Sequence, residues 1–350
     1  MLPNLTHLFK LGAPWVLAFY LSMSCSSSYA QDLHYSQFYN EPMVYNPALT
    51  GIFNGDHRFI FSFRDQGRNV PVPYLSFTAA YDRKLFAKSS DRRFFGVGGF
   101  INYDKQGDSN LRLININLTG SYSYLINDRN IISLGGLLGF GNRAFDPTNL
   151  TWDSQWNTTT NTFNSSAPSG ENFSYESFNF LETALGFNYR WQKSVRTKVD
   201  LGVGAYHISQ PNTTFYNNTS EELPMRLSFY GIGTMELTPK LDIQLDALYQ
   251  IQNVYRGLQF GSYLNMYLNQ ARGKNRQFRV GAGYKTIAEV LFIKAGVQIN
   301  EWFVSASYDI DFYEFSRLDP VDPSRGPEVH IRYIIKNVKP QGKFKVCPIF

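Results

Sequence analysis

Residues 240–268 contain two adjoining segments in which apolar and polar side chains alternate. The apolar positions are Leu241, Ile243, Leu245, Ala247, Tyr249 and Ile251 in the first segment and Leu258, Phe260, Leu264, Met266 and Leu268 in the second. Successive side chains of a strand point to opposite faces, so this period of two predicts an amphipathic β-hairpin that turns at Asn253. We expect an all-β chain in which such hairpins repeat and close into a barrel whose apolar side faces lipid.

The aromatic content agrees with a membrane barrel. Aromatic residues make up 16% of the 350 residues, with 23 Tyr and 29 Phe. Barrels place such residues in girdles at both lipid interfaces. After the N-terminal segment, no apolar run approaches the ~18 residues that a membrane helix needs, whereas a barrel strand needs apolar residues only at every second position over ~10 residues.

The first residues have the pattern of a targeting signal. Lys10 precedes the apolar run 16–21, and Ser28, Tyr29 and Ala30 form a small-x-small cleavage site. We therefore expect a signal peptide over residues 1–30 and a mature protein that begins at Gln31.

Cys25 offers an alternative, a lipoprotein signal. However, Ser22 stands three residues before Cys25, where an aliphatic side chain is expected, and this argues against lipidation. Cleavage after Ala30 leaves Cys347 as the single thiol, so an internal disulfide is not expected and stability must come from the sheet.

Residues 31–56 lack any period and contain Pro42 and Pro47. We interpret them as an irregular N-terminal segment and a candidate plug of the barrel. A transmembrane antiparallel β-barrel of about fourteen strands is predicted over residues 57–337. Besides the first hairpin, the predicted strands are 57–65, 75–85, 94–105, 111–125, 131–143, 178–192, 198–209, 225–237, 277–286, 290–299, 302–312 and 328–336. Clusters of Gly residues, at 96–99 and 135–141, are expected to mark bends and close approaches in the curved sheet.

The predicted connections between strands, numbered in chain order, fall into two classes that differ in length and charge. The long ones, 144–176, 211–224 and 313–326, are odd-numbered, and the even-numbered ones are short and carry Lys and Arg. Outer-membrane barrels have short periplasmic turns and longer exterior loops, so we expect the long connections outside. Residues 338–350 then form a basic periplasmic tail. This tail either extends the last strand towards Phe350 or, as Pro340 and Pro348 favour, has no regular structure.

The sequence gives little support for catalysis or for a cofactor. The histidines after residue 30 are His34, His57, His207 and His330, and no two are spaced as metal ligands. His207 and Ser209 lie on one side of a predicted strand and could pair as base and nucleophile, but a polar strand end contains the same residues. We expect neither an enzyme nor a metal or cofactor.

The charges have an equally simple structural explanation. Asp242, Asp246, Asp309 and Asp311 are predicted to point into the lumen, as a cation filter or as partners of inward arginines such as Arg112 and Arg279. The net charge is +5, without a basic aromatic patch or a Cys/His finger. Nucleic acid is therefore not an expected partner.

Several short motifs resemble the PorP/SprF family of type IX secretion system membrane proteins. The family's S-Q-(F/Y) and Y-N-P-A-x-x-G elements fall on Ser36, Gln37, Phe38, Tyr45, Asn46, Pro47, Ala48 and Gly51. Its (Y/F)-R-(D/N)-Q element resembles Phe63, Arg64, Asp65 and Gln66. Its aliphatic-Gly, His and Pro element resembles Val203, Gly204, His207 and Pro211, which are spaced here as V-G-x-x-H-x-x-x-P. Near the C-terminus, Gly326, Glu328, Val329, Cys347 and Pro348 are similar to the family's G-x-E-(I/V) and Cys-Pro elements.

The resemblance implies an outer-membrane component of the machinery that exports and displays surface proteins, in some members gliding adhesins. It also implies contact with a periplasmic ring made of a lipoprotein and its partner. The expected partners are therefore outer-membrane lipids, the periplasmic ring and an exported surface protein or adhesin. A general diffusion porin is the alternative function.

Overall fold

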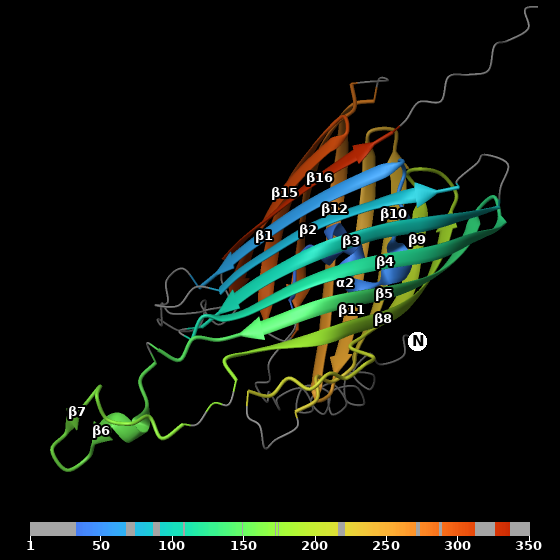
Figure 1. Ribbon diagram of the computed structural model, residues 1–350. Coiled ribbons are helices and arrows are strands. Elements are labelled where there is room, and N and C mark those ends of the chain that lie inside the picture. The colour runs from blue at the N-terminus through green and yellow to red at the C-terminus, as the bar shows by residue number, and fades with distance from the viewer. Residues whose placement is uncertain are drawn as a thin grey trace, which may run out of the picture. The chain divides into compact units, whose positions relative to one another are not determined.

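The computed structural model describes residues 33–67, 74–86, 92–107, 109–148, 150–171, 173, 175–215, 221–270, 274–286, 289–311 and 326–336. The predicted signal peptide and the predicted tail lie outside these residues. Fourteen antiparallel strands form one closed barrel, in which β1 pairs with β16 (Figure 1). The fold prediction is therefore confirmed.

The barrel strands follow one another in chain order around the wall. They are β1 (His57–Gln66), β2 (Tyr74–Leu85), β3 (Arg93–Gln106), β4 (Leu111–Asn127), β5 (Asn130–Ala144), β8 (Ser177–Gln192), β9 (Lys198–Tyr206), β10 (Arg226–Thr238), β11 (Leu241–Gln252), β12 (Tyr255–Asn269), β13 (Arg276–Lys285), β14 (Val290–Ile299), β15 (Trp302–Asp311) and β16 (Gly326–Ile335). The short strands β6 (Trp156–Asn157) and β7 (Thr162–Phe163) pair only with each other, in the connection after β5 that also holds the 3-10 turn η3 (Asp153–Gln155).

One predicted strand is too long. Residues 198–209 were expected to form a single strand, but β9 ends at Tyr206. His207 and Gln210 have φ angles of 56° and 42°, which no strand accommodates. His207 and Ser209 therefore do not share a strand face, and the Ser209 hydroxyl donates to the carbonyl oxygen of Leu181.

The two faces of the barrel wall separate as the alternation predicts. On β11 and β12, Leu245 and Phe260 are 56% and 47% exposed on the outside, whereas Asp242 and Asp246 point inwards and are 1% and 3% exposed. The apolar side chains form the lipid-facing surface. Leu248 is an exception, because it occupies an inward position and is buried.

The connections alternate between the two ends of the barrel. One end, here called the loop end, carries connections 67–73, 107–110, 145–176, 207–225, 253–254, 286–289 and 312–325. The opposite turn end carries connections 86–92, 128–129, 193–197, 239–240, 270–275 and 300–301. The longest connections thus share one end. Within the described residues, no helix is long and apolar enough to cross a membrane.

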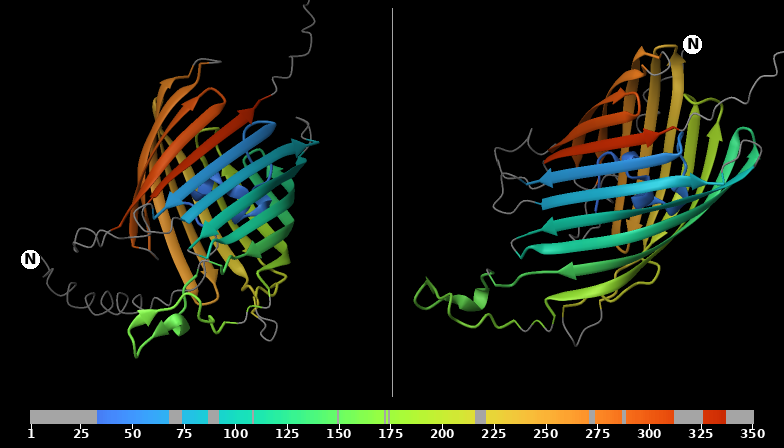
Figure 2. Two further views of the ribbon diagram at one scale, coloured as in Figure 1. Left: turned by 60° about the vertical axis from the view of Figure 1, so that its left-hand side comes forward. Right: turned by 45° about the horizontal axis from the view of Figure 1, so that its top comes forward.

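Residues 33–56, here called the luminal segment, lie inside the barrel. They form three short helical turns, η1 (Phe38–Asn40), α2 (Pro42–Tyr45) and η2 (Pro47–Leu49), which are visible behind the front strands in Figures 1 and 2. His34 contacts the Tyr255 hydroxyl at the loop end (2.7 Å), and the Asp56 amide donates to the carbonyl of Ile335 at the turn end (2.8 Å). The segment therefore crosses the lumen from the loop end to the turn end.

Candidate functional site in the barrel lumen

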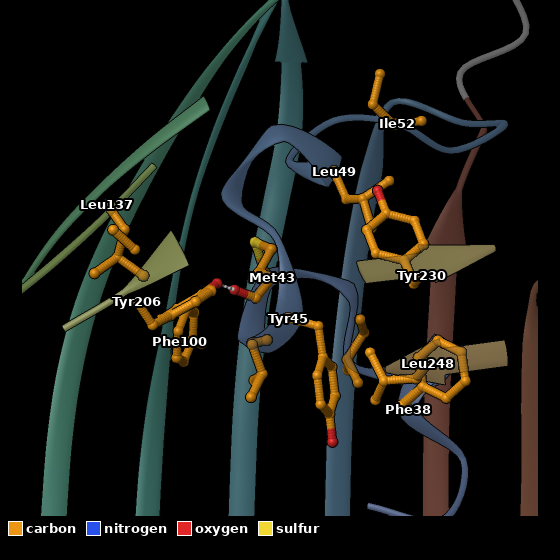
Figure 3. Close-up of a cluster of buried hydrophobic side chains, with 14 residues drawn as sticks. Phe38, Met43, Tyr45, Leu49, Ile52, Phe100, Leu137, Tyr206, Tyr230 and Leu248 are labelled. Carbon is orange, nitrogen blue, oxygen red and sulfur yellow. Dashed lines mark hydrogen bonds between the residues drawn. The ribbon is translucent and has the colours of Figure 1, made fainter. Parts of the chain in front are cut away.

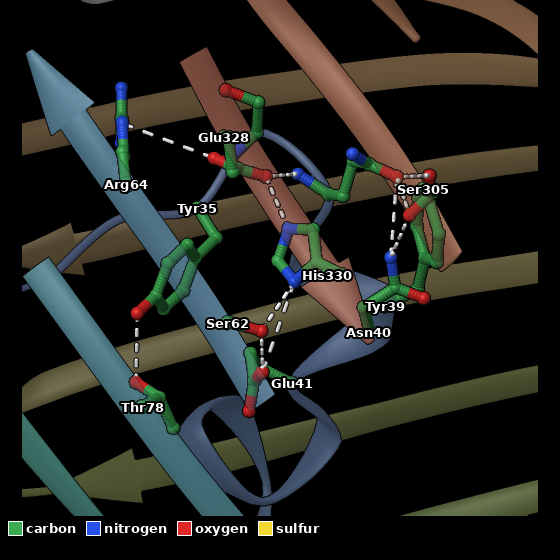
Figure 4. A network of polar contacts seen from close by, with 12 residues as sticks. Tyr35, Tyr39, Asn40, Glu41, Ser62, Arg64, Thr78, Ser305, Glu328 and His330 are labelled. Carbon is green, nitrogen blue, oxygen red and sulfur yellow. Dashed lines mark hydrogen bonds and ion pairs between the residues drawn. The ribbon is translucent and has the colours of Figure 1, made fainter. Parts of the chain in front are cut away.

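The first part of the luminal segment is held by a carboxylate on the last strand. The Glu328 carboxylate accepts hydrogen bonds from the backbone N–H groups of Ser36 (2.7 Å) and Gln37 (2.9 Å), and His330 Nε2 lies 2.6 Å from it (Figure 4). Arg64 Nε is 3.9 Å away. Glu328 is 1% exposed, so these contacts are made out of water, where charge-assisted hydrogen bonds are strong.

A second carboxylate, Asp309 on β15, completes this anchor. It accepts from the Ser36 hydroxyl (2.6 Å), from Arg64 (2.8 Å) and from Lys285 (2.9 Å). Arg64 also donates to the carbonyl oxygen of His34. Two cations and two carboxylates from four strands therefore surround the backbone at residues 34–37, and the buried charges compensate each other.

The Gln37 side chain joins the segment to the barrel wall through its carbonyl oxygen. This oxygen accepts hydrogen bonds from the hydroxyls of Tyr263 and Ser305, both at 2.9 Å, and from the Asn40 amide at 3.2 Å. Glu41 continues the network, because its carboxylate contacts the hydroxyl of Ser62. These contacts link the segment on both sides of η1 to β1, β12 and β15, and Figure 4 shows those at Ser62 and Ser305.

The segment 45–50 lies directly against glycines of the barrel wall. A Cβ atom at Gly135 would be 2.3 Å from Ala48 N, and one at Gly204 would be 2.2 Å from the carbonyl oxygen of Tyr45. Gly96 meets the carbonyl oxygen of Thr50 in the same way, whereas Gly186 meets the side chain of Asn46. β3, β5, β8 and β9 therefore lack a side chain where the segment passes. These four glycines form a surface, here called the glycine surface, on which the segment packs.

Asn46 fixes the segment on this glycine surface. Its amide N–H₂ donates to the carbonyl oxygen of Phe187 (2.8 Å) and to the Tyr230 hydroxyl (3.0 Å). Its carbonyl oxygen accepts from the backbone N–H of Ala48 (2.8 Å), which caps η2 at its N-terminus. Both ends of one amide are thus used, one for the wall and one for the local turn.

A buried ion pair holds the point where the segment turns towards β1. Arg58 donates twice to Asp82, at 2.8 Å and 2.7 Å, and the same carboxylate accepts from the backbone N–H of Gly51 (2.7 Å). Gly51 has a φ of 76°, in the left-handed region that favours glycine, and a Cβ there would lie 2.9 Å from Gly96.

The apolar side chains of the segment form a small core inside the lumen. Phe38, Met43, Val44, Tyr45, Leu49 and Ile52 pack on inward side chains of the wall, namely Ile60, Ala80, Phe100, Leu137, Ala184, Tyr206, Tyr230 and Leu248. Figure 3 shows Phe100, Leu137, Tyr206, Tyr230 and Leu248 of the wall beside the segment. The Tyr206 hydroxyl donates to the carbonyl oxygen of Met43. Burial of these groups adds a hydrophobic contribution to the polar anchors.

The glycine surface gives a direct prediction. Gly135→Val places a side chain within 2.5 Å of the backbone at Pro47 and Ala48, so the segment or the strand must move. We expect a loss of about 1–3 kcal/mol in the free energy of unfolding, as for other overpacked sites. Urea unfolding followed by tryptophan fluorescence measures it, and chymotrypsin is expected to begin cleaving at Tyr45.

The adjacent Gly136→Val is the matched control. Its Cβ would meet only Leu185 and Ala184 at 3.8–3.9 Å on the lipid side, so we expect a change below about 0.5 kcal/mol. Equal effects of the two substitutions would contradict the close packing of the luminal segment on β5.

A sequence comparison identifies the family of this chain. Residues 27–320 match the family described as type IX secretion system membrane protein PorP/SprF. The chain belongs to the PorP/SprF family. The predicted family membership is thereby confirmed, and the barrel fold together with the membership places the protein in the outer membrane. No curated protein sequence matches the chain significantly.

Solved structures with the same fold have very different sequences. The monoaromatic hydrocarbon channel CymD is 13% identical, with a TM-score of 0.50 over 85% of this chain and 93% of that one. The toluene transporter TbuX of Ralstonia pickettii (13% identity, TM-score 0.47, 84% and 93% covered) and a FadL homologue of Pseudomonas aeruginosa (12%, 0.49, 82% and 91%) are similar too. At these identities the likeness shows the barrel fold alone.

Most of the PorP/SprF motif positions lie together in the lumen. Gln37, Tyr45, Asn46, Pro47, Ala48 and Gly51 belong to the luminal segment. Arg64 and Glu328 hold its first residues. Asp65 and Gln66 end β1 at the loop end. The functional role of these positions stays a prediction.

Two motif positions lie elsewhere. His207 follows β9 at the loop end, where its Nδ1 is 2.7 Å from Glu182 and its backbone N–H donates to the same carboxylate. Cys347 lies outside the described residues. Gly204, three residues before His207, nevertheless belongs to the glycine surface below Tyr45.

The inward acids pair with basic residues other than those expected. Asp242 binds Arg196, Asp246 binds Lys294, and Asp309 binds Arg64 and Lys285. Asp242 and Asp309 therefore pair with arginines, as expected, but these are Arg196 and Arg64 and not Arg112 or Arg279. The side chain of Asp311 is outside the described residues. Asp242 also raises the pKa of Arg196, mainly through their hydrogen bond.

Several residues of the site were not singled out from the sequence. Asp82, His330 and Glu41 are fully buried members of the polar network. Ile60 and Leu248 are apolar residues at inward positions, where the alternation calls for polar ones. Apolar side chains on the otherwise polar inner face were the sequence signal that another part of the chain covers them inside the barrel.

Proposed function

We propose that this PorP/SprF barrel is a closed, non-enzymatic component of the type IX apparatus that docks periplasmic machinery and engages an exported surface protein. The observation that carries the proposal is the luminal segment, which crosses the lumen with residues 35–53 buried or half-buried. In this proposal the segment is a plug. A barrel filled in this way is suited to holding partners and not to free diffusion.

The orientation of the barrel follows from its connections. Outer-membrane barrels have short periplasmic turns and longer exterior loops, so the loop end faces the exterior in this proposal. The loop end carries a half-exposed aromatic cluster: Phe145 contacts Phe173 and Phe215, with ring centroids 4.8 and 4.5 Å apart. Phe178 packs on Phe215 as well, at 5.0 Å. These rings join two loops into one surface, on which an exported protein or gliding adhesin would be held.

The turn end provides the proposed docking surface for the periplasmic ring. Arg92, Arg93, Arg129, Lys193, Lys240, Lys274 and Arg276 lie in or beside its turns. Basic side chains clustered on one face favour an acidic partner. Arg196 belongs to the same end but points inwards, where it binds Asp242 and Glu236.

A triad-like arrangement in the lumen does not favour an enzyme. Ser62 contacts His330 Nδ1, and His330 Nε2 lies 2.6 Å from Glu328. However, these three residues are at most 1% exposed, the Ser62 hydroxyl also contacts Glu41, and Glu328 is engaged by two backbone N–H groups. A substrate therefore has no access to the serine, and the arrangement serves to hold the luminal segment.

Two measurements on the full-length protein test the proposal. In planar bilayers we expect purified wild type to carry no steady current, whereas a steady open-channel current would favour the diffusion porin. In detergent extracts we expect the barrel to co-purify with periplasmic lipoproteins of the type IX system.

Removal of the tail after Lys336 is expected to lower this recovery several-fold, because the basic tail adds to the charge of the turn end. Deletion of the β6–β7 hairpin at the loop end is the control and should leave recovery unchanged. If recovery of the lipoproteins is unchanged without the tail, the tail is not part of the docking surface. If the control variant loses recovery, the lipoproteins dock at the loop end and not at the turn end.

A further inference from the structure

A cavity of about 290 Å³ lies between the luminal segment and the turn end. Tyr39, Ile52 and Phe53 of the luminal segment line its inner side, and Asn300 and Lys336 line it at the turn end. The cavity shares Arg58 with the ion pair at Asp82, but none of its lining residues belongs to the anchors at Glu328 and Asp309. It is therefore a separate feature of the lumen.

Six buried or half-buried cations line this cavity, and they fall into two groups. Three have a carboxylate partner: Arg58 with Asp82, Arg190 with Asp200 and Arg196 with Asp242, at 2.6–2.7 Å. The other three, Lys198, Arg279 and Arg332, have no acidic partner among the described residues. Like charges gathered at partly desolvated positions repel one another, so an anion at this place would stabilise the protein.

The two unpaired arginines are held in fixed positions by one ring. Arg279 on β13 and Arg332 on β16 both stack on Phe303, with guanidinium carbons 4.5 and 4.7 Å from the ring centroid. Phe303 is 1% exposed. Arg279 Nε is buried without a hydrogen-bond partner, and its Nη2 contacts only the Gln277 side chain at 3.2 Å. Stacking leaves the N–H edges of a guanidinium available, and these edges match a carboxylate.

We propose that this cavity binds an acidic peptide segment of a periplasmic protein, with its carboxylates on Arg279 and Arg332. The cavity volume is of the order of known ligand pockets, roughly 300 Å³ and above, and exceeds what a single small anion fills. Tyr39, Ile52 and Phe53 add apolar surface beside the cations, which suits a peptide better than a bare anion. The cavity lies inside the barrel, away from lipid headgroups. That the ligand comes from the periplasm rests on the orientation in the proposed function.

Binding of a defined peptide to the full-length protein in non-ionic detergent tests this site. The probe is a short peptide with two Glu and one Phe and an uncharged fluorophore, and its counterpart carries Gln at both acidic positions. We expect fluorescence anisotropy to show binding of the acidic peptide only. The double variant Arg279→Gln/Arg332→Gln should bind the acidic peptide roughly 10-fold or more weakly. The loss of hydrogen bonds between charged groups lowers an affinity by about this factor.

Arg256→Gln is the matched control. It removes a cation from β12 beside the 253–254 turn at the loop end, where Arg256 is exposed and does not line the cavity. Binding to this variant should equal that to wild type. Gel mobility with and without heating checks that each variant is folded. If the double variant fails this check, the salt dependence of wild-type binding decides, since an ion-pairing site must weaken as ionic strength rises.

Three results would overturn the site: equal binding of the Gln peptide, unchanged binding to the folded double variant, or binding that is insensitive to salt. Displacement of the peptide by equimolar inorganic phosphate would assign the site to a small anion and contradict the peptide. These measurements need neither current nor a type IX partner. The site and the proposed function can therefore fail independently.

Discussion

Removing residues 31–53 is expected to turn a silent barrel into one that carries steady ionic current. The luminal segment fills the middle of the lumen, and its residues 35–53 are buried or half-buried there. Fourteen strands enclose more space than their own inward side chains fill, as the packing of an additional segment inside them demonstrates. Planar bilayer recordings of the purified variant beside wild type, at equal protein amounts, measure the effect.

Deletion of residues 156–163 is the matched control for this experiment. This deletion removes the β6–β7 hairpin, which pairs only with itself and lies outside the barrel sheet, so the variant should stay silent. A folded barrel without residues 31–53 that carries no current would contradict the plug. A wild type that conducts as well as the truncated protein would contradict it too, and would favour the diffusion porin.

The barrel could be predicted from the sequence because the alternation of apolar and polar side chains can be recognised within each strand separately. Each strand of a lipid-exposed barrel must alternate, and the pattern at 241–251 is visible without knowing what pairs with it. Where backbone conformation ends a strand, side-chain alternation does not predict the end. His207 ends β9 with a φ of 56°, and no periodicity of side chains encodes that angle.

The interior of the barrel could be predicted only in part, because its contacts join residues far apart in sequence. Glu328 binds the backbone of Ser36 and Gln37 almost 300 positions away, and Asp82 binds the backbone of Gly51. A backbone N–H carries no sequence signal, so neither partnership follows from residue types. The motif resemblance did single out Gln37, Arg64 and Glu328, but it gave no geometry for them.

The glycines illustrate the same limit in another way. Gly96 and Gly135 were expected to mark bends or close approaches in the sheet, and close approach is what the structure has at both. The backbone that approaches both glycines belongs to the luminal segment, however, and not to a neighbouring strand; at Gly96 the side chain of Ser121 on β4 is close as well. A glycine in the sequence indicates that a position has no room for a side chain. Only the structure shows which part of the chain occupies that space.

Glu328→Ala is expected to release the first part of the luminal segment and to destabilise the protein by about 3–5 kcal/mol, the usual cost of removing one partner from a buried ion pair. The change leaves the backbone N–H groups of Ser36 and Gln37 without an acceptor, and it removes the carboxylate beside Nε2 of His330. Urea unfolding followed by tryptophan fluorescence gives the free energy, and cleavage by chymotrypsin at Phe38 reports whether the segment has left its place.

Two further variants separate the charge of Glu328 from its hydrogen bonds. Glu328→Gln keeps one acceptor oxygen for the segment but removes the negative charge beside Arg64 and His330, so its effect should fall between wild type and Glu328→Ala. Glu301→Ala removes an exposed carboxylate at the turn end and should change stability by less than about 0.5 kcal/mol. If Glu328→Ala behaves like Glu301→Ala, the carboxylate does not hold the segment. The anchor would then consist of Asp309, Arg64 and the glycine surface alone.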